Sequence, residues 1–589
     1  MNTKTALISV YNKEGIVEFA KELAKLGFNI LASGGTAKVL LEAGVKVTDV
    51  ATIVGEPILG HRVVTLSREV HAALLSRDTA EDEAELKRIG VPRIDLVCVD
   101  LYPLEEEIAK WEQPLSPSDA LGDSPLARGE AAMSAILEKT DIGGPTMLRS
   151  AAKGRRMIVC DPKDRIKMID WLKNGQPDKE NIITKYCAKA EFIVADYVLA
   201  SARYLSSGNI DGVVAHQVLG LKYGENGWQV PAGLFKNEIA DELSLANFKL
   251  VAGATPSYNN FADVDRLLQT ITHIAAGFDL NRDTLSALRA SPPKGESSAV
   301  VPMIAVGVKH GNPCGAAVSD DPSSAIKNML EGDLRAIFGG LVMVNFSVDE
   351  KLAEVLLTHK MQSGRRLLDG IIAPSFTSGA IDMLKRKGDK CRFLVNPALE
   401  HLTKDSVDKH RRFRYVRGGI LMQPNYRFVL DFNDVADKSA RYNSDADKSR
   451  RFGRDRSARY NSGRISNSQK SDLLLAWAVG STSNSNTVTI VKDGRLLGNG
   501  VGQQDRVSCC QLAIKRATDA GHSVKDAVAY SDSFFPFVDG VQTLSDAGIK
   551  TIFATSGSVR DEEIKKFCFD NGITLFMLPD SEARGFFGH

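Results

Sequence analysis

The sequence lacks several features that mark special classes of protein. No apolar run approaches the roughly 18 residues that a membrane-spanning helix requires, and residues 473–479 form one of the longest runs. The N-terminus leads directly into an apolar strand, without the layout of a secretory signal peptide. From these absences we expect a cytoplasmic protein that has no membrane partner.

An excess of charge of either sign is also missing. The 74 Lys and Arg residues nearly balance the 73 Asp and Glu residues, which leaves a formal net charge of +1. This balance does not favour nucleic acid as the main partner. The eight cysteines form no CxxC pair, and the adjacent Cys509 and Cys510 are poorly placed to bridge each other. The pattern is typical of a reduced protein without a structural zinc site.

At 589 residues the chain is too long for one hydrophobic core, and we expect two to four domains. In the N-terminal region short apolar strands alternate with helical periodicities, which predicts an α/β fold with a doubly wound parallel sheet. The expected strands are residues 5–10, 28–32, 45–50 and 94–101, and the expected helices are residues 16–26, 33–41 and 183–204.

Two stretches of the N-terminal half predict irregular structure. Residues 111–129 contain three prolines with several Ser and Asp residues, which indicates an exposed loop. The turn residues Ser206–Asn209 mark a candidate boundary. We therefore expect one domain over residues 1–207 and a second region over residues 208–589.

Two junctions on the predicted sheet have the composition of an anion site. Ser9 with Lys13 follows one strand, and Ser33-Gly34-Gly35-Thr36 joins the next strand to a helix. Free N–H groups at a helix start attract anions, and glycine lets a phosphate approach the backbone. A Gly-Gly turn alone is often only a turn, but two such junctions, one with a lysine, favour a phosphate site.

The stretch Lys309-His310-Gly311-Asn312-Pro313-Cys314-Gly315 follows a short apolar run, residues 303–308, which predicts a buried strand. Because Asn-Pro and Gly favour tight turns, we expect Lys309 and His310 at the strand end, just before the chain turns. A histidine can accept a proton near neutral pH, and an ammonium can stabilise an oxyanion. The dipeptide also fits an ordinary strand end with a solvated lysine.

Residues 438–465 differ in composition from their surroundings. The string at 438–444 nearly recurs at 456–462, with a basic spacer between the copies. A basic segment with interleaved tyrosines is compatible with RNA contact. Its polar composition more strongly predicts a solvated insertion that buries little apolar surface, and we expect its deletion to leave folding and activity intact.

Several strings, in this order and spacing, resemble the bifunctional purine-biosynthesis family that joins AICAR formyltransferase to IMP cyclohydrolase. The resemblance extends from Ile8 to His589, and the strings that carry it are Ser33-Gly34-Gly35-Thr36-Ala37, Leu101-Tyr102-Pro103, Asp141-Ile142-Gly143-Gly144-Pro145-Thr146, Tyr223-Gly224-Glu225-Asn226, Ser257-Tyr258-Asn259-Asn260, Lys309 to Gly315, Val416-Arg417-Gly418-Gly419 and Ser531-Asp532-Ser533-Phe534-Phe535-Pro536-Phe537. It implies a methylglyoxal-synthase-like N-terminal domain, followed by two cytidine-deaminase-like α/β subdomains.

The resemblance also implies the reactions and the partners. Formyl transfer from 10-formyltetrahydrofolate to AICAR would give FAICAR, and a dehydrative ring closure would then give IMP. The formyl donor is the only cofactor implied, the other partners are these small molecules, and the family implies a homodimer with shared formyltransferase sites. The sequence itself does not distinguish the folate donor from free formate.

A metal is not implied. Zinc deaminases require H-x-E together with P-C-x-x-C. Here Pro313-Cys314 is followed by Gly315-Ala316-Ala317, and no H-x-E string accompanies it. The deaminase-like fold is therefore expected without a metal-activated water.

The resemblance assigns roles to individual residues. For formyl transfer it implies His310 as the base that takes the amine proton, Lys309 as the cation beside the formyl oxygen, and Asn486 as the group that orients the formyl. The polar groups implied around the ring closure are Tyr102, Asp141 and Lys153. The residues implied to bind nucleotide or phosphate are Ser9, Lys13, Ser33, Gly34, Gly35, Thr36, Arg62, Thr65, Lys222, Tyr223 and Asn259. Those implied on the folate side are Phe338, Gly339 and Phe534.

Some positions depart from the family pattern. Val64 stands where the family's Arg-Val-Lys-Thr motif has its lysine, and Asp100 stands where it has an asparagine before Leu-Tyr-Pro. Lys222 replaces an arginine, and Trp228 replaces a histidine. These changes leave three hypotheses: a full bifunctional enzyme, a formyltransferase with a weak or inactive cyclohydrolase half, or a catalytically reduced nucleotide-binding regulatory protein.

Overall fold

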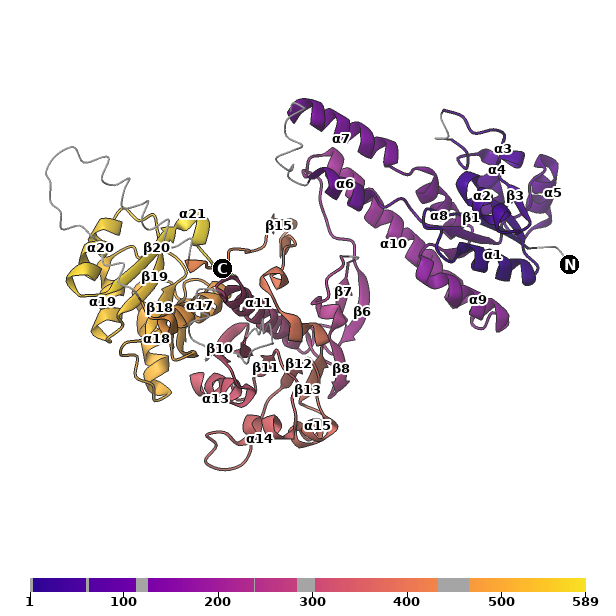
Figure 1. Cartoon of the computed structure of the whole chain (residues 1–589). Coiled ribbons are helices and arrows are strands. Elements are labelled where there is room, and N and C mark those ends of the chain that lie inside the picture. The colour runs from indigo at the N-terminus through magenta and orange to yellow at the C-terminus, as the bar shows by residue number, and fades with distance from the viewer. Residues whose placement is uncertain are drawn as a thin grey trace, which may run out of the picture. The chain divides into compact units, whose positions relative to one another are not determined.

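The computed structural model describes residues 4–59, 63–112, 125–237, 239–282, 302–432 and 465–588. The chain forms two compact units, Met1–His216 and Gln217–His589. Each unit has its own sheet and its own hydrophobic core, and Figure 1 shows the elements of each.

The first unit is built on a five-stranded parallel sheet with the order β3-β2-β1-β4-β5. Its strands are β1 (Thr5–Ser9), β2 (Asn29–Ala32), β3 (Val47–Asp49), β4 (Leu96–Val99) and β5 (Met157–Val159). Its helices are α1 (Ile16–Lys25), α2 (Gly34–Glu42), α3 (Ala51–Val54), α4 (Arg68–Leu75), α5 (Ala80–Ile89), α6 (Leu104–Glu112), α7 (Pro125–Lys139), α8 (Gly143–Lys153), α9 (Arg165–Lys173) and α10 (Lys179–Leu205).

Both faces of this sheet are covered, because successive side chains of a strand point to opposite faces. Ala6 and Ile8 of β1 pack into one cluster with residues of α1, α2 and α9. Leu7 packs into the other cluster with residues of α4, α8 and α10. The three central residues of the strand, Ala6, Leu7 and Ile8, are therefore all apolar, as expected for a parallel sheet buried on both sides, and the predicted doubly wound fold is confirmed.

The prediction of one loop over residues 111–129 is wrong at both of its ends. Trp111 and Glu112 close α6, and α7 begins at Pro125. Proline suits the first turn of a helix, where its missing N–H has no partner to lose, so Pro125 marks a helix start there. Residues 113–124 between the two helices lie outside the described part of the chain.

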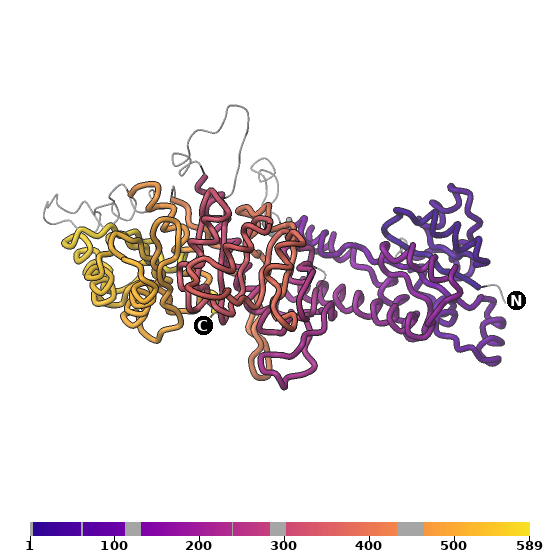
Figure 2. Tube along the Cα trace, turned by 90° about the horizontal axis from the view of Figure 1, so that it is seen from below, coloured from indigo at the N-terminus to yellow at the C-terminus, as the bar shows by residue number. Residues whose placement is uncertain are grey.

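The second unit contains an eleven-stranded sheet formed by two repeats of the same topology. In the first repeat the strand order is β10-β9-β11-β12-β13, and in the second it is β17-β16-β18-β19-β20. Each repeat begins with an antiparallel hairpin and continues with parallel strands joined by helices. The hairpin strands β10 and β17 join the repeats into one sheet. Figure 2 traces the second repeat toward the yellow C-terminal end.

The first repeat comprises α11 (Tyr258–Leu280), β9 (Met303–Lys309), β10 (Asn312–Ser319), α13 (Pro322–Gly332), β11 (Leu341–Val344), α14 (Glu350–Thr358), β12 (Gly370–Ala373), α15 (Ser378–Leu384) and β13 (Arg392–Val395). The second comprises α17 (Asn467–Ser481), β16 (Val488–Lys492), β17 (Arg495–Gly500), α18 (Arg506–Asp519), β18 (Val528–Ser531), α19 (Val538–Asp546), β19 (Thr551–Ser556), α20 (Asp561–Asp570), β20 (Thr574–Pro579) and α21 (Asp580–Ala583). The strand β8 (Lys249–Ala252) extends the sheet beside β13.

One helix of each repeat lies on the same face of the sheet. Helices α11 and α17 pack together there and share a core with strands of both repeats. The apolar run at residues 473–479 is fully buried in this core, which explains its composition without a membrane. Within the described residues, no helix has the length and apolarity needed to cross a bilayer.

Two small hairpins complete the second unit. They are β6 (His216–Leu221) with β7 (Ala232–Lys236), and β14 (Arg412–Val416) with β15 (Gly419–Gln423). The predicted insertion at 438–465 lies outside the described residues except for Ile465. The α/β fold class, with a parallel N-terminal sheet followed by two related subdomains, is confirmed.

Candidate active sites

The first unit has a large cavity where its parallel strands end. The chain passes from β1 to β2 on one side and later to β4 on the other, so the direction of winding reverses between β1 and β4. Ligands of such sheets bind at the carboxyl ends of the strands beside this reversal. The cavity of about 1120 Å³ lies there, lined by Ser9 and Val10 at the end of β1 and by Val99 and Asp100 at the end of β4.

The predicted anion-binding residues line or underlie this cavity. The hydroxyl oxygens of Ser9 and Ser33 are 2.7 Å apart, and Gly34 and Gly35 begin α2 without a side-chain cap. The Lys13 ammonium donates to the Val10 carbonyl and, at 3.1 Å, to the buried Thr36 hydroxyl. An uncapped helix start beside two hydroxyls and an ammonium is suited to a phosphate group.

A buried ion pair supports the loop that carries Lys13. The Asp100 carboxylate accepts hydrogen bonds from the N–H groups of Tyr11 and Asn12 and from the Arg165 guanidinium at 3.0 Å. Burial raises the pKa of Asp100, although these donors and the Lys13 charge oppose the shift. Sequence reasoning missed Arg165, because it lies at the start of α9, far from this loop in the chain.

Asp141 lies in the cavity wall just before α8. Its carboxylate accepts the N–H of Gly144 at 2.9 Å, and a Cβ at Gly144 would lie 2.3 Å from its Oδ2 atom. Thr65 Oγ1 lies on the neighbouring side, 2.9 Å from where a Cβ at Gly143 would be. Burial raises the pKa of Asp141, opposed by the N–H groups of the two glycines. A carboxyl group with a raised pKa can exchange protons with a ligand.

Tyr102 reaches the cavity together with a lysine that sequence reasoning did not identify. The Lys139 ammonium, at the end of α7, donates to the Tyr102 hydroxyl at 2.5 Å, and both residues line the cavity. The rings of Tyr11 and Tyr102 meet edge to face, with centroids 4.7 Å apart. No motif marked Lys139, because its role depends on the packing of α7 against α6.

The structure separates Lys153 from Tyr102, another predicted ring-closure residue. Lys153 ends α8, about 15 Å of helix from its start near Asp141. It lines a second cavity of about 650 Å³, which Asp141 also borders, rather than the cavity of Tyr102 and Lys13. Thr65 and the departure Val64 do line the first cavity, whereas Arg62 lies outside the described residues.

In the second unit, Lys309 and His310 lie at the tip of the first repeat's hairpin. The expectation that the turn contains Asn312, Pro313 and Gly315 is wrong, because Asn312 already pairs with Lys309 across the ladder. The two turn residues are His310 and Gly311, with φ of 87° and 70°. Positive φ at both positions is the pattern of the two-residue turn that matches strand twist. Pro313 instead lies in β10, where the register shifts before Gly315.

Contacts of this hairpin tip join predicted residues. The Lys309 ammonium donates to the Phe338 carbonyl and lies 3.7 Å from where a Cβ at Gly339 would be. The Gly311 N–H donates to Asp263 of α11 at 2.6 Å. Burial raises the pKa of Asp263, and the His310 charge is among the effects that oppose the shift. Sequence reasoning had not singled out this contact.

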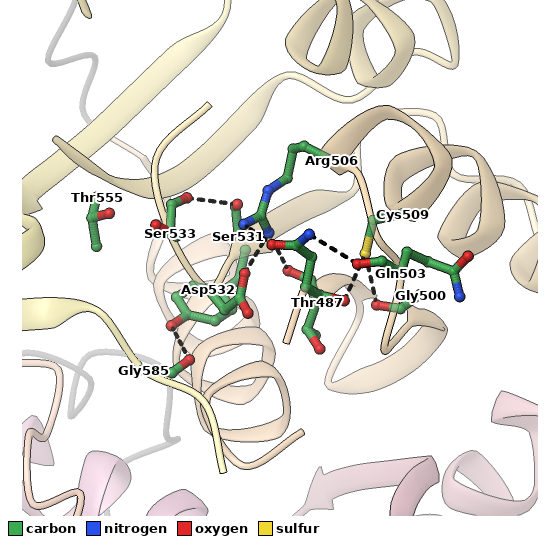
Figure 3. Close-up of polar contacts among 12 residues, drawn as sticks. Thr487, Gly500, Gln503, Arg506, Cys509, Ser531, Asp532, Ser533, Thr555 and Gly585 are labelled. Atoms are coloured by element: carbon green, nitrogen blue, oxygen red, sulfur yellow. Dashed lines mark hydrogen bonds and ion pairs between the residues drawn. The ribbon is translucent and has the colours of Figure 1, made fainter. Parts of the chain in front are cut away.

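The second repeat also reaches the hairpin tip. The Asn484 N–H donates to the Asn312 side chain at 3.3 Å. Two residues later, the Asn486 side chain donates to the Gln503 carbonyl and accepts from the Arg506 guanidinium, each at 2.9 Å. Arg506 in turn pairs with fully buried Asp532 and donates to the Thr487 carbonyl. Figure 3 shows Arg506 between Asp532 and Thr487.

The predicted loop residues of the second unit contact the start of α11. The Lys222 N–H donates to Pro256, and the Tyr223 carbonyl accepts from the Tyr258 N–H. The Asn259 side chain donates to the Glu225 carbonyl at 3.0 Å. Because Asp263 lies one turn further along α11, these loops and the Lys309-His310 hairpin belong to one region. Half-buried Phe534 follows Asp532 by two residues.

Comparison with known families matches both parts of the chain. The family described as AICARFT/IMPCHase bienzyme matches residues 151–516. The family described as MGS-like domain matches residues 15–115, which include half of the residues that line the first unit's cavity. No group of three or more His, Cys, Asp or Glu side chains in the described residues is placed to hold a metal ion.

Two relatives that match nearly the whole chain have the same name. A bifunctional purine biosynthesis protein PurH of Persephonella marina is 32% identical over 585 residues, covering 97% of this chain and 98% of that protein. The protein of that name from Anoxybacillus flavithermus is 33% identical over 584 residues, with the same coverage. A solved structure titled Crystal structure of ForH is 30% identical and covers 34% of this chain and 98% of that chain, with a TM-score of 0.27.

Proposed function

Because the chain belongs to the AICARFT/IMPCHase bienzyme family, we propose that its two units divide the two reactions between them. Residues 1–207 would close the ring, and residues 208–589 would transfer the formyl group. The division is supported by the match of the MGS-like family to the first unit and by the separate core of each unit.

The enzyme carries out the last two steps of IMP synthesis. It transfers a formyl group from the co-substrate 10-formyltetrahydrofolate to AICAR, and it then closes FAICAR to IMP with loss of water. The hypotheses of an inactive cyclohydrolase half and of a regulatory protein are not favoured, since three full-length relatives at 31–33% identity have the bifunctional name.

For formyl transfer, the AICAR amine forms a bond to the formyl carbon while the bond from that carbon to the folate nitrogen breaks. The amine loses a proton, and the folate nitrogen gains one. His310 would accept the amine proton, and Lys309 would stabilise the oxyanion of the tetrahedral intermediate. Asn486 would orient the formyl group, held by its hydrogen bond to Arg506.

The observation that carries this assignment is the hairpin tip. The turn at His310 and Gly311, both at positive φ, holds Lys309 and His310 together at the tip. Phe338 of the first repeat contacts this tip through Lys309, and Asn484 of the second repeat contacts it through Asn312. A site built from both repeats has groups on two sides of a reacting centre, which is what two bulky substrates require.

For ring closure, the FAICAR carboxamide nitrogen forms a bond to the formyl carbon, and the formyl oxygen leaves as water. The two protons of that water come from the two ring-forming nitrogens. Ser9, Lys13, Ser33, Gly34, Gly35 and Thr36 would bind the phosphate, and Tyr102 and Asp141 would move protons. The raised pKa of Asp141 supports its role. A role for Lys153 would require it to act from outside the first cavity.

One assay tests the whole proposal. Purified protein is supplied with AICAR and 10-formyltetrahydrofolate, and FAICAR is separated from IMP by chromatography over time. We expect FAICAR to appear and then to be converted to IMP. Free formate in place of the folate is expected to give no product. Accumulation of FAICAR without IMP would contradict the cyclohydrolase assignment, and the absence of FAICAR would contradict the formyltransferase assignment.

We also propose a homodimer. Tyr415 and Leu421 on the β14–β15 hairpin are 80% and 58% exposed, and an isolated hairpin with exposed apolar side chains is marginal without a partner. In sedimentation equilibrium we expect twice the chain mass of 63.9 kDa. Tyr415→Ser with Leu421→Ser is expected to weaken the dimer, whereas Val559→Ser, at an even more exposed apolar position outside the hairpin, is the control. A monomeric unmodified protein would contradict this.

A cytoplasmic location is part of the same proposal. All eight cysteines are free thiols, and seven of them are buried, which suits a reducing compartment. Cell fractionation with an antibody to the protein is the measurement, and recovery with secreted or membrane material would contradict it.

A further inference from the structure

The cavity of the first unit contains more carboxylates than cations. The described acidic residues that line it are Asp49, Glu56, Asp100, Glu138 and Asp141, whereas its described lysines are Lys13 and Lys139. Lys13 faces the floor, where it donates to Val10 and Thr36 beside the uncapped start of α2. Among the described lining residues, only Lys139 therefore brings a positive charge to the part of the cavity that contains Tyr102.

The contacts of Lys139 hold its positively charged ammonium next to the side chain of Tyr102. Its ammonium lies 2.5 Å from the Tyr102 hydroxyl and 4.8 Å from the centre of the ring. Glu107 of α6 lies 3.8 Å away and is also paired with Lys110. The hydrogen bond to Tyr102 raises the pKa of Lys139, so the group is an ammonium at neutral pH. The Tyr102 hydroxyl thus has a permanent cation beside it.

The cavity is also lined by an apolar residue at a position where the family motif has a lysine. Val64 lines the same cavity and cannot offer charge to a substrate. Lys153 lies at the far end of α8 and borders the second cavity. Ring closure creates negative charge on the formyl oxygen before that oxygen leaves as water, and a fixed cation near it lowers the barrier.

We propose that Lys139 supplies the positive charge for ring closure, as a positioning residue that acts through Tyr102. The proposal rests on the proposed cyclohydrolase function of this cavity. Lys139 would hold the Tyr102 hydroxyl against the formyl oxygen and stabilise the charge that develops there. The water that leaves carries the protons of the two ring-forming nitrogens, so the step needs no further reactant.

The test uses the full-length enzyme with FAICAR as substrate and IMP formation as the readout. Lys139→Met is expected to lower kcat about 10²-fold, as loss of one charge-stabilising donor does. The KM for FAICAR and the formyl transfer rate are expected to change less than about threefold, because the phosphate-binding groups and the second unit are untouched. Lys139→Arg keeps the charge and is expected to retain most of the activity.

Two further variants separate this role from a structural one. Lys110→Met removes a charge from the same Glu107 but not from the cavity lining, and it is expected to cyclise normally. In the Lys139→Met background, Val64→Lys returns a cation to the cavity and is expected to restore kcat at least tenfold. Parallel losses in Lys139→Met and Lys110→Met, without rescue by Val64→Lys, would indicate a structural role and overturn the proposal.

The cyclisation rate of the unmodified enzyme separates the proposed function of the cavity from the proposed role of Lys139. If it forms no IMP from FAICAR, the proposed function of the cavity fails, and the role of Lys139 fails with it. If it cyclises and Lys139→Met retains its kcat within threefold, the cyclohydrolase function stands and Lys139 is excluded.

Discussion

His310 has a backbone conformation that L residues rarely adopt. Its φ of 87° lies in the left-handed half of the Ramachandran plot, where a residue with a Cβ has a cost of order 1–3 kcal/mol. The hairpin would accept glycine at this position more easily. This backbone cost fits the proposed role of the His310 side chain beside Lys309.

Replacement of His310 by glycine is expected to separate stability from activity. Because glycine adopts this φ freely, His310→Gly should unfold at the same or a slightly higher temperature. Loss of the general base should lower formyl transfer about 10²–10⁴-fold. Differential scanning calorimetry and the rate of FAICAR formation are the measurements.

The second repeat provides a matched control for this variant. Asp493 and Gly494, with φ of 53° and 71°, form the equivalent turn between β16 and β17. Asp493→Gly relieves the same backbone cost without removing a proposed base, so it is expected to keep normal formyl transfer. Normal activity in His310→Gly would contradict the site assignment.

The turn between β16 and β17 depends on a carboxylate of a neighbouring helix. Asp472 of α17 accepts the N–H of Gly494 at 2.7 Å and of Asp493 at 3.1 Å. Burial raises the pKa of Asp472 to about 6, although these two N–H groups oppose the shift. The helix and the hairpin are therefore coupled through a group that titrates in a mildly acidic range.

This coupling predicts a pH dependence of stability. The folded-state pKa of Asp472 lies above its unfolded value, so the folded state binds the proton more tightly. The resulting stabilisation is fully present below the unfolded pKa and is lost as pH rises through about 6. This shift in the pKa of Asp472 corresponds to a change of at most about 3 kcal/mol in the free energy of unfolding.

The variant Asp472→Asn tests whether ionisation of Asp472 lowers the stability of the fold as pH rises. It cannot titrate, so its melting temperature relative to the natural protein is expected to rise by a few degrees between pH 4.5 and pH 7. Asp526→Asn, at a loop position in the same repeat, is the control and should show no such trend. A constant difference across this pH range would show that Asp472 does not titrate as described.

Each unit has a core large enough to fold without the other. The first unit packs its sheet between two apolar clusters drawn entirely from its own residues, and its cavity is lined by that unit alone. The sheet of the second unit is likewise covered by its own helices. The described residues that line the proposed ring-closure site therefore all belong to the first unit.

Residues 1–216 expressed alone are expected to fold and to cyclise FAICAR at a rate within about tenfold of the full chain, since each domain of this size can fold independently. Circular dichroism and IMP formation are the measurements. The same fragment with Asp141→Asn is the control, because it should fold equally well but cyclise poorly. A fragment that folds without cyclising would place part of the site in the second unit.

The sequence by itself determined the architecture of the first unit. Short apolar runs and period-3.6 apolar patterns located β1, α1, β2 and α10 to within a few residues, because they record which residues of an element are buried. It also predicted an anion site at the two junctions that contain Ser9 and Ser33, and both residues line one cavity; Asp141, which the family resemblance implied, lines it too. The prediction of one loop over residues 111–129 was wrong because proline is common both in loops and at the first position of helices.

Only the tertiary structure decided which side chains meet across long stretches of chain. Lys139 contacts Tyr102, Arg165 pairs with Asp100, and Asp263 binds the hairpin turn, yet no local pattern marks these residues. The resemblance implied Lys153 as a ring-closure residue, and only the tertiary structure shows that it borders a second cavity, which Asp141 also lines. Local sequence fixes the periodicity and the ends of elements, whereas such contacts depend on how elements pack, which is set by the whole core.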